Sequence, residues 1–231
     1  MNMKNDLIVI FDLDGTLIDT IGDLAAAVEN ALSRNGFPGH SVEEYRKMVG
    51  HGIRNLVTRA LPEGVSEGTI DTVLSDFVEY YTAHIDVLSR PYPGIHQLLR
   101  KLNEAGVRIS VASNKFQAGT EMLIKRFFPD VPFVKILGNA PGLPLKPDAA
   151  VVRLAMDAAE TSRGVLVGDS ATDIRTAHNA GIPAIAVSWG FRPKSDLEAA
   201  EAVADSVDDL SNLIFEYLSG NSGLNSFDRQ G

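Results

Sequence analysis

The stretch that decides the fold is Leu7-Ile8-Val9-Ile10-Phe11-Asp12-Leu13-Asp14-Gly15-Thr16. Its first five residues are apolar at every position, which is typical of a strand whose two faces are both buried in a parallel sheet. Polar residues begin where this strand ends. Open α/β proteins bind ligands beyond the carboxyl ends of their strands, so the stretch predicts a buried strand that leads directly into a site.

Beyond a rigid break at Arg90-Pro91-Tyr92-Pro93-Gly94, strand and helix patterns alternate along the chain. The expected strands are 107–112, 133–137, 165–168 and 184–187, and the expected helices are 95–105, 117–127, 148–159, 171–179 and 207–218. This alternation is typical of βαβ units. It predicts an α/β fold with a Rossmann-like parallel sheet and helices on both faces.

A long helical segment interrupts the alternating pattern after the first strand. Thr16 and Ser113 are separated by positions 17 to 112, which is 96 residues, whereas a βαβ unit needs only about 30. Residues 41–88 show helical periodicity, so we expect an inserted α-helical cap; the alternative is a helical decoration of the sheet that does not move. The expected boundaries are 17–90 for the cap, 1–16 and 91–231 for the core, and 219–231 for a frayed tail.

Composition narrows the class of protein further. The chain has 231 residues, 45% of them hydrophobic, and its formal net charge is −9. The length allows a large core, and the acidic balance argues against nucleic acid or an anionic membrane as a partner. Cysteine is absent, which excludes disulfides, Cys-ligated metals and a Cys nucleophile. The apolar run 7–11 is too short for a membrane span or a signal peptide, so we expect a cytoplasmic protein, of undefined oligomeric state.

Asp12 and Asp14 are the first candidate reactive pair. In an extended chain, residues two apart point to the same side. Two neighbouring carboxylates cannot both ionise at low cost unless a cation joins them or one keeps its proton. The pair therefore indicates a metal site, or an acid beside an ionised nucleophile. The competing interpretation is an Asx-type turn at the end of a strand.

Further polar residues follow the other expected strands. Asp169 comes after a buried strand, and carboxylate oxygens are ligands that suit Mg²⁺; its alternative role is to cap the next helix. Lys146 is either a point charge for a phosphate oxygen or a solvated loop lysine. Ser113 would donate a hydrogen bond to another phosphate oxygen. Each of these signals is weak by itself.

Taken together and in this order, the residues resemble the motifs of the haloacid dehalogenase superfamily of phosphohydrolases. The four motifs correspond to Asp12-Leu13-Asp14-Gly15-Thr16, Ser113, Lys146, and Gly168-Asp169-Ser170 with Asp173. The resemblance covers nearly the whole chain, and the insertion lies where the family has its helical C1 cap. It implies that the first and fourth core strands are neighbours, which would bring Asp169 beside Asp12.

The resemblance also implies a role for each motif residue. Asp12 would be the nucleophile that forms an aspartyl-phosphate, and Asp14 the general acid and base. The other implied roles are Mg²⁺ binding by Asp12, Asp169 and the main-chain carbonyl of Asp14, phosphate binding by Thr16, Ser113, Asn114 and Lys146, and support of the metal site by Asp173 and Ser170. Asp14 favours a phosphatase or phosphomutase, because a departing halide would need no proton.

The expected cap contains the candidate specificity residues. Gly50-His51-Gly52 and the following Arg54 are similar to the cap loop of bacterial phosphoglycolate phosphatases, as is Val187-Ser188-Trp189-Gly190-Phe191. Arg54 would pair with a substrate carboxylate, or it is a solvated helix arginine. The implied activity is Mg²⁺-dependent hydrolysis of a small phosphomonoester, with 2-phosphoglycolate as the leading substrate.

Three other functions compete with this one. The first is a phosphatase for another small ester or for pyrophosphate. The second is a phosphomutase like β-phosphoglucomutase, but those enzymes carry a histidine soon after the first motif, where this chain has Thr20-Ile21-Gly22-Asp23. The third is a non-enzymatic phospho-acceptor like a response-regulator receiver, which is about half as long and lacks an inserted cap.

Overall fold

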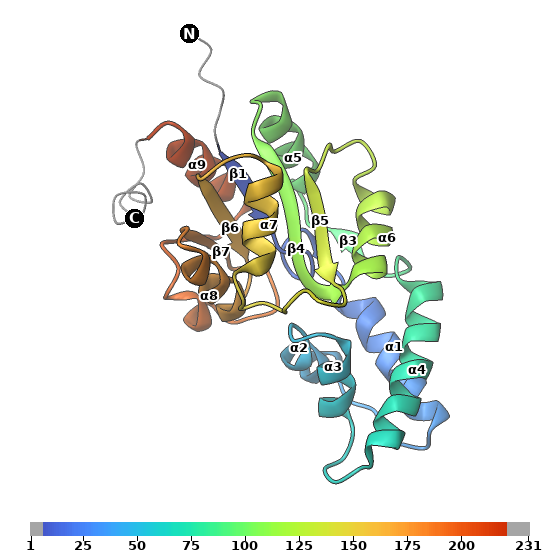
Figure 1. Ribbon diagram of the computed structural model, residues 1–231. Helices are drawn as coiled ribbons and strands as arrows, with labels where there is room; N and C mark the ends of the chain where they lie inside the picture. The colour runs from blue at the N-terminus through green and yellow to red at the C-terminus, as the bar shows by residue number, and fades with distance from the viewer. Residues whose placement is uncertain (1–6, 221–231) are drawn as a thin grey trace.

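A parallel sheet of six strands lies at the centre of the computed structural model, which describes residues 7–220 (Figure 1). The strands, in spatial order, are β5 (Lys135–Asn139), β4 (Arg108–Phe116), β1 (Ile8–Phe11), β6 (Gly164–Gly168), β7 (Ala184–Val187) and β8 (Ala202–Ala204). β1 occupies the middle of the sheet, where Phe11 pairs with Val111 of β4 and Val167 of β6. The predicted fold class is confirmed, and Asp12 and Asp169 follow adjacent strands.

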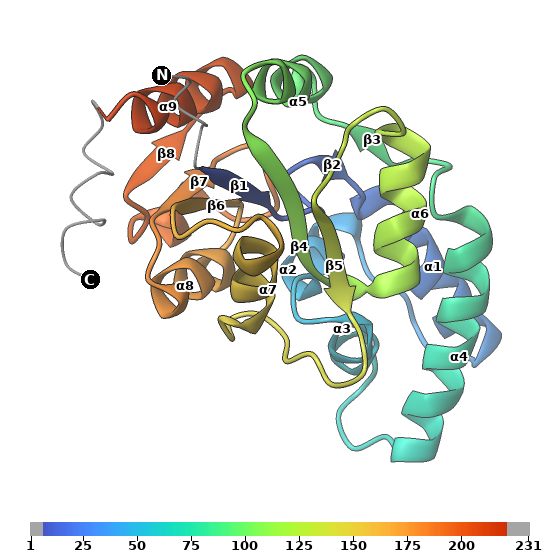
Figure 2. The ribbon, with the colours of Figure 1, turned by 45° about the horizontal axis from the view of Figure 1, so that its top comes forward.

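Helices cover both faces of the sheet (Figure 2). One layer consists of α7 (Ala150–Ala158) and α8 (Ala171–Ala180), and the other of α5 (Ile95–Glu104), α6 (Gln117–Phe127) and α9 (Val207–Leu218). Successive β1 side chains alternate between these layers: Ile8 and Ile10 pack with the first, and Val9 and Phe11 with the second. All four are fully buried, which explains why the strand is apolar at every position.

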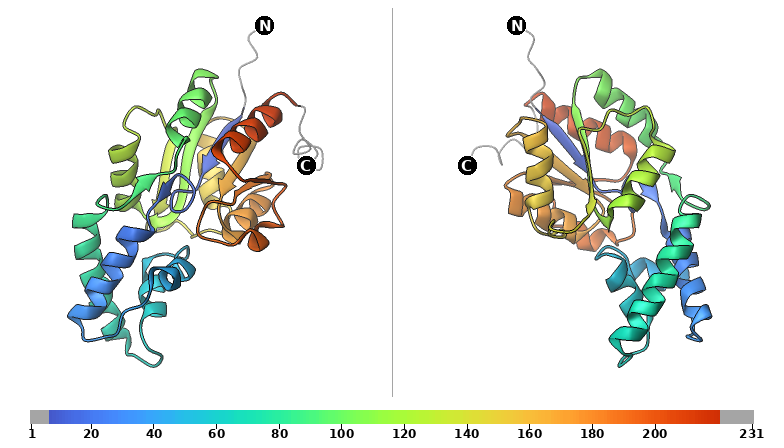
Figure 3. Two further views of the ribbon diagram at one scale, coloured as in Figure 1. Left: turned by 180° about the vertical axis from the view of Figure 1, so that it is seen from behind. Right: turned by 45° about the vertical axis from the view of Figure 1, so that its right-hand side comes forward.

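Four helices are inserted between β1 and the core helix α5 that precedes β4. They are α1 (Ile21–Arg34), α2 (Val42–Met48), α3 (Ile53–Ala60) and α4 (Glu67–His84). We call residues 21–84 the helical insertion. It lies beyond the carboxyl ends of the sheet strands, in all views (Figures 1 and 3). None of the helices described here is long and apolar enough to cross a membrane.

The two connections to the helical insertion run side by side. They form a short antiparallel pair, β2 (Ile18–Asp19) with β3 (Arg90–Pro91), which the sequence did not predict. Asp23 at the start of α1 joins the same region: its carboxylate accepts hydrogen bonds from the backbone N–H groups of Leu88 and Ser89, each at 2.8 Å. A buried carboxylate is tolerable here because backbone donors satisfy it.

Some predicted boundaries were wrong. The predicted strand 107–112 continues as β4 to Phe116, so Ser113 and Asn114 lie within a strand and not beyond its end. The pairing of β4 with β5 is irregular between Ala112 and Phe116, and such irregularities re-aim side chains near sites. The strand β8 and the short 3₁₀ helix η1 (Lys194–Leu197) were not predicted at all. The predicted frayed tail lies, from residue 221 onward, outside the described residues.

Candidate active site

The site lies between the carboxyl edge of the sheet and the helical insertion. A cavity of about 50 Å³ separates them. Its floor carries residues that follow or belong to β1, β4 and β6, and its cover comes from α1, α3 and the loop at residues 49–52. The predicted core motifs and the predicted specificity loop therefore face one cavity.

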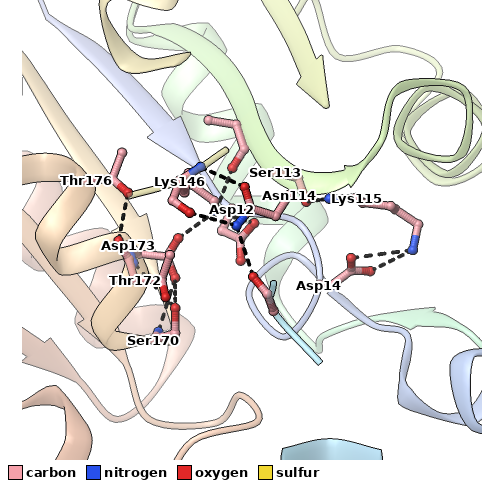
Figure 4. A network of polar contacts seen from close by, with 12 residues as sticks. Asp12, Asp14, Ser113, Asn114, Lys115, Lys146, Ser170, Thr172, Asp173 and Thr176 are labelled. Atoms are coloured by element: carbon pink, nitrogen blue, oxygen red, sulfur yellow. Dashed lines mark hydrogen bonds and ion pairs between the residues drawn. The ribbon is translucent and has the colours of Figure 1, made fainter. Parts of the chain in front are cut away.

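Three acids form a cluster at the floor of this cavity. Asp12, Asp169 and Asp173 are buried, and each offers a carboxylate oxygen within 4.8 Å of the others. The ammonium group of Lys146 lies 2.8 Å from Asp12 Oδ1 and 2.6 Å from Asp173 Oδ1 (Figure 4). It also donates to the carbonyl of Ala112 at 2.9 Å. The cluster thus joins three motifs that are far apart in sequence.

The electrostatics of the cluster show an excess of negative charge. Burial raises the pKa of Asp12 to about 7, although the charge of Lys146 opposes this rise. Burial, together with repulsion from Asp12 and Asp173, raises the pKa of Asp169 to about 8. Burial acts to lower the pKa of Lys146, but the two acids beside it outweigh burial and raise it. Because one lysine faces three acids, a further cation would be stabilised here.

The donor set fits a hard divalent cation. Oxygen ligands of this kind suit Mg²⁺. The backbone comes close to Asp169 from two sides, since a Cβ atom at Gly15 or Gly190 would collide with this side chain. The backbone N–H of Phe191 donates to Asp169 Oδ2 at 2.6 Å. Asp169 does not cap the next helix; Ser170 does, in a capping box with Asp173.

The carboxylate of Asp14 points away from this cluster (Figure 4). Lys115 Nζ lies 3.1 Å from Asp14 Oδ1, and the hydroxyl of Thr20 donates to the same oxygen at 2.7 Å. Lys115 also donates to the hydroxyl of Tyr81 on α4 at 2.6 Å. Lys115 is therefore the charged group in direct contact with Asp14.

The two predicted phosphate-binding hydroxyls differ in their position, because Ser113 lines the cavity and Thr16 does not. Ser113 Oγ accepts from the backbone N–H of Lys115 at 3.2 Å, and within residues 7–220 its own proton is donated to no atom. Thr16 Oγ1 is buried and has no hydrogen-bond partner in that range. A buried hydroxyl without a partner is costly, so an arriving acceptor would relieve that cost.

Asn114 is used differently from this prediction. Its amide nitrogen donates to the carbonyls of Gly50 at 3.0 Å and Lys146 at 3.1 Å, and its amide oxygen accepts from Lys146 N at 2.8 Å. Both amide protons are therefore already occupied, and the side chain connects the loop of the helical insertion to the backbone of Lys146. Because the side chain is occupied, the predicted role of Asn114 in phosphate binding stays a prediction, and it now concerns the main chain of this residue.

The predicted specificity residues divide into two groups. Gly50 and Gly52 line the cavity, whereas His51 and Arg54 do not. Arg54 lies on the surface of the helical insertion, where its guanidinium pairs with Glu67 and Asp71 of α4 at 2.5 and 2.6 Å. The hypothesis that Arg54 faces the substrate does not match this geometry, because two acids on a neighbouring helix already hold it.

Sequence reasoning missed two cations of the cavity, Lys115 and Arg192. Each follows a motif residue directly, since Lys115 comes after Ser113-Asn114 and Arg192 after Trp189-Gly190-Phe191. The rule that ligands bind at the carboxyl edge of a parallel sheet places both residues near the site, but it assigns neither of them a role.

A parallel sheet with this acid cluster at its strand ends, and with helices inserted after its first strand, defines the class of protein. Residues 9–187 match the family of haloacid dehalogenase-like hydrolases. The chain belongs to this family, and the predicted resemblance is confirmed.

Relatives of known name place the chain within the family. It is 35% identical over 191 residues to a phosphoglycolate phosphatase of Mesorhizobium japonicum, covering 80% of this chain and 83% of the relative. It is 32% identical over 218 residues to one of Agrobacterium fabrum, covering 91% and 93%. A crystal structure from Lactobacillus delbrueckii subsp. bulgaricus, of a protein proposed to be a phosphoglycolate phosphatase, superposes with a TM-score of 0.86 at 31% identity, covering 92% of this chain and 99% of that one. The chain is thus a phosphatase of this family, as the motifs predicted.

Proposed function

We propose that the protein hydrolyses 2-phosphoglycolate with the help of Mg²⁺ and through an aspartyl-phosphate intermediate. The observation that carries this proposal is the buried cluster of Asp12, Asp169 and Asp173 beside Lys146, at a cavity covered by the helical insertion. The names of the relatives at 32% and 35% identity support the choice of substrate.

Asp12 is the proposed nucleophile. A carboxylate oxygen of Asp12 forms a bond to phosphorus as the bond from phosphorus to the ester oxygen breaks, which yields an aspartyl-phosphate and an alkoxide. A water oxygen then attacks phosphorus, the bond to Asp12 breaks, and phosphate is released. Asp12 is suited to this task because it is held at the cavity floor by Lys146.

Asp14 is the proposed proton carrier. It gives its proton to the departing glycolate oxygen in the first step and takes a proton from the attacking water in the second. Asp14 lines the same cavity as Asp12, and Lys115 and Thr20 hold its carboxylate. To reach the ester oxygen from the position seen here, its side chain must turn toward Asp12.

The remaining core residues bind the phosphoryl group and the metal. Lys146 and the hydroxyls of Ser113 and Thr16 would contact phosphoryl oxygens, as would the backbone of Asn114. The proposed ligands of Mg²⁺ are Asp12, Asp169 and the main-chain carbonyl of Asp14, with Asp173 and Ser170 as their support. When bound, Mg²⁺ supplies positive charge between the nucleophile and the phosphoryl group.

The helical insertion forms most of the proposed cap, whose boundaries are residues 17–90 as expected from the sequence. It covers the cavity of about 50 Å³ at the acid cluster. A cytoplasmic location, where such metabolites occur, is part of this proposal. The alternative substrates, another small ester or pyrophosphate, have no specific observation in their favour.

A kinetic panel tests the proposal. The purified chain is assayed with 2-phosphoglycolate, sugar phosphates, nucleotides and pyrophosphate, with Mg²⁺ and with a chelator. We expect the highest kcat/KM for 2-phosphoglycolate and loss of activity on chelation. A preferred substrate without a carboxylate would refute the phosphoglycolate assignment, and full activity in the chelator would refute the role of the metal.

A further inference from the structure

Three cationic side chains line the cavity, and acids already neutralise two of them. Lys146 is paired with two members of the acid cluster, and Lys115 with Asp14. The third is Arg192, which follows β7. Among the residues that the structure describes, no carboxylate forms an ion pair with Arg192. The cavity therefore presents one positive charge that no carboxylate of residues 7–220 pairs with directly.

The contacts of Arg192 leave most of its donors available. Nη1 donates to the carbonyl of Arg46 at 2.6 Å, and Nη2 donates to the carbonyl of Val49. Both acceptors are neutral and belong to the helical insertion. A guanidinium group has five N–H donors, so three remain for a ligand. Lys146, by contrast, faces two carboxylates and the carbonyl of Ala112, and it would exchange one of these contacts for a phosphoryl oxygen.

Arg192 lies between the acid cluster and the loop of the helical insertion. Its charge opposes part of the rise that burial causes in the pKa of Asp169. On the other side, burial and then the charge of Arg192 lower the pKa of His51. Asp169 belongs to the proposed reaction centre and lines the same cavity as Arg192, so a ligand held there shares the cavity with the guanidinium.

We propose that Arg192 binds the carboxylate of a phosphorylated short-chain hydroxy acid and so selects this class of substrate. This inference rests on the proposed phosphatase function. A guanidinium fork matches a carboxylate through two parallel charge-assisted hydrogen bonds. The substrate has two anionic ends: the phosphoryl group is assigned to Asp12 and Lys146, and the carboxylate requires a second cation. Arg192 fills that need, whereas Arg54 is paired outside the cavity.

The test compares two esters in matched variants. The esters are 2-phosphoglycolate and n-propyl phosphate, which has a similar length but no carboxylate. Arg192→Gln loses the charge, and its shorter side chain also weakens the contacts with the carbonyls of Arg46 and Val49. Arg192→Lys keeps a charge but not the fork. Arg153→Gln, at an exposed position on α7, is the control for the loss of one positive charge.

We expect R192Q to lower kcat/KM for 2-phosphoglycolate on the order of 10- to 100-fold, because hydrogen bonds to charged groups contribute roughly 1.5–3 kcal/mol. Its kcat/KM for n-propyl phosphate should change by about threefold or less. R192K should lose a smaller part of the preference for 2-phosphoglycolate over n-propyl phosphate, and R153Q should behave like the wild type.

The remaining outcomes contradict either carboxylate binding by Arg192 or the proposed phosphatase function. Equal losses on both esters in R192Q would show that Arg192 only holds the helical insertion. If R192Q fails to fold, R192K decides, and an unchanged preference there overturns the proposal. A wild type that hydrolyses n-propyl phosphate as well as 2-phosphoglycolate would refute carboxylate recognition and leave the phosphatase function intact. A wild type that hydrolyses neither would remove the proposed function and this inference with it.

Discussion

Lys115 and Asp14 form an ion pair of 3.1 Å between positions that are 101 residues apart in the sequence. The lysine side chain is almost fully buried, and its ammonium also donates to the hydroxyl of Tyr81 and lies 4.6 Å from the centre of that ring. Tyr81 belongs to α4 of the helical insertion. The proposed acid and base is therefore connected through one side chain to the element that covers the cavity.

This contact predicts a leaving-group effect. Lys115→Met should lower kcat for 2-phosphoglycolate on the order of 10- to 100-fold, a part of what general acid catalysis typically contributes. The loss for p-nitrophenyl phosphate should be much smaller, because its leaving group departs without a proton. Tyr81→Phe keeps the ring and removes one hydrogen bond, so it should have a weaker effect. Steady-state kinetics on both esters decides the matter, and equal losses would mean that Lys115 acts on something other than Asp14.

Asp12→Asn should abolish turnover and leave the fold intact. The variant removes the nucleophilic oxygen, so we expect kcat to fall by at least about 1,000-fold, within the range by which enzymes exceed uncatalysed rates. Its far-ultraviolet circular dichroism should match the wild type, because Lys146 keeps its contact with Asp173 at 2.6 Å. Trapping with labelled substrate provides a second readout: the wild type should accumulate label on Asp12 and the variant should not. Retained turnover would show that another group is the nucleophile.

The sequence was most informative for the central strand β1. The run at residues 7–11 is apolar at every position because helices cover both faces of β1, and this pattern is visible without any partner. The position of the acids that follow it could also be predicted, because the carboxyl ends of parallel strands all lie at one edge of the sheet, where ligands bind. The adjacency of β1 and β6 came from the resemblance, because local patterns do not determine strand order.

Long-range contacts could not be predicted from local patterns. Arg54 has a side chain that suits a carboxylate and lies just after the predicted specificity loop, but Glu67 and Asp71 bind it from a neighbouring helix. The end of β4 was placed too early, because Ser113 and Asn114 are polar, whereas the site buries both of them. In each case a contact with a distant part of the chain determines how the residue is used, and the local sequence pattern does not indicate that contact.

Removal of the metal should make stability depend on pH. Burial raises the pKa values of Asp12 and Asp169 to about 7 and about 8 in the folded protein, from an ordinary aspartate value of 3.8. Between about pH 4 and pH 8 the folded state thus retains protons that the unfolded state has released, so the stability of the metal-free protein falls as pH rises. Lys146 stays protonated in both states across this window. We expect the Tm of the metal-free protein to decrease from pH 5 to pH 8.

Mg²⁺ should reverse this trend, since it binds the ionised carboxylates and releases their protons. The rise in Tm on adding Mg²⁺ should therefore be larger at pH 8 than at pH 5, as measured by differential scanning fluorimetry. Asp169→Asn removes one proposed ligand and should reduce this rise at both pH values. A rise that is equal at the two pH values, or larger at pH 5, would contradict the assignment of these acids to a metal site.

Asn114 and Ser113 are neighbours on β4, and the structure assigns them separate tasks. Asn114→Ala would leave the backbone N–H of Lys146 and the carbonyls of Gly50 and Lys146 without their partner. Gly50 is exposed, so water can satisfy its carbonyl, but Lys146 is buried. Each of its two unsatisfied groups costs about 1–3 kcal/mol, so we expect a loss of about 2–6 kcal/mol in the free energy of unfolding, measured by urea titration. Ser113→Ala removes one hydroxyl that makes a single 3.2 Å contact, so its stability should change by less than about 1 kcal/mol, whereas its KM for 2-phosphoglycolate should rise. The opposite pattern, with a stable Asn114→Ala and an unstable Ser113→Ala, would show that the amide contacts the phosphoryl group and the hydroxyl supports the fold.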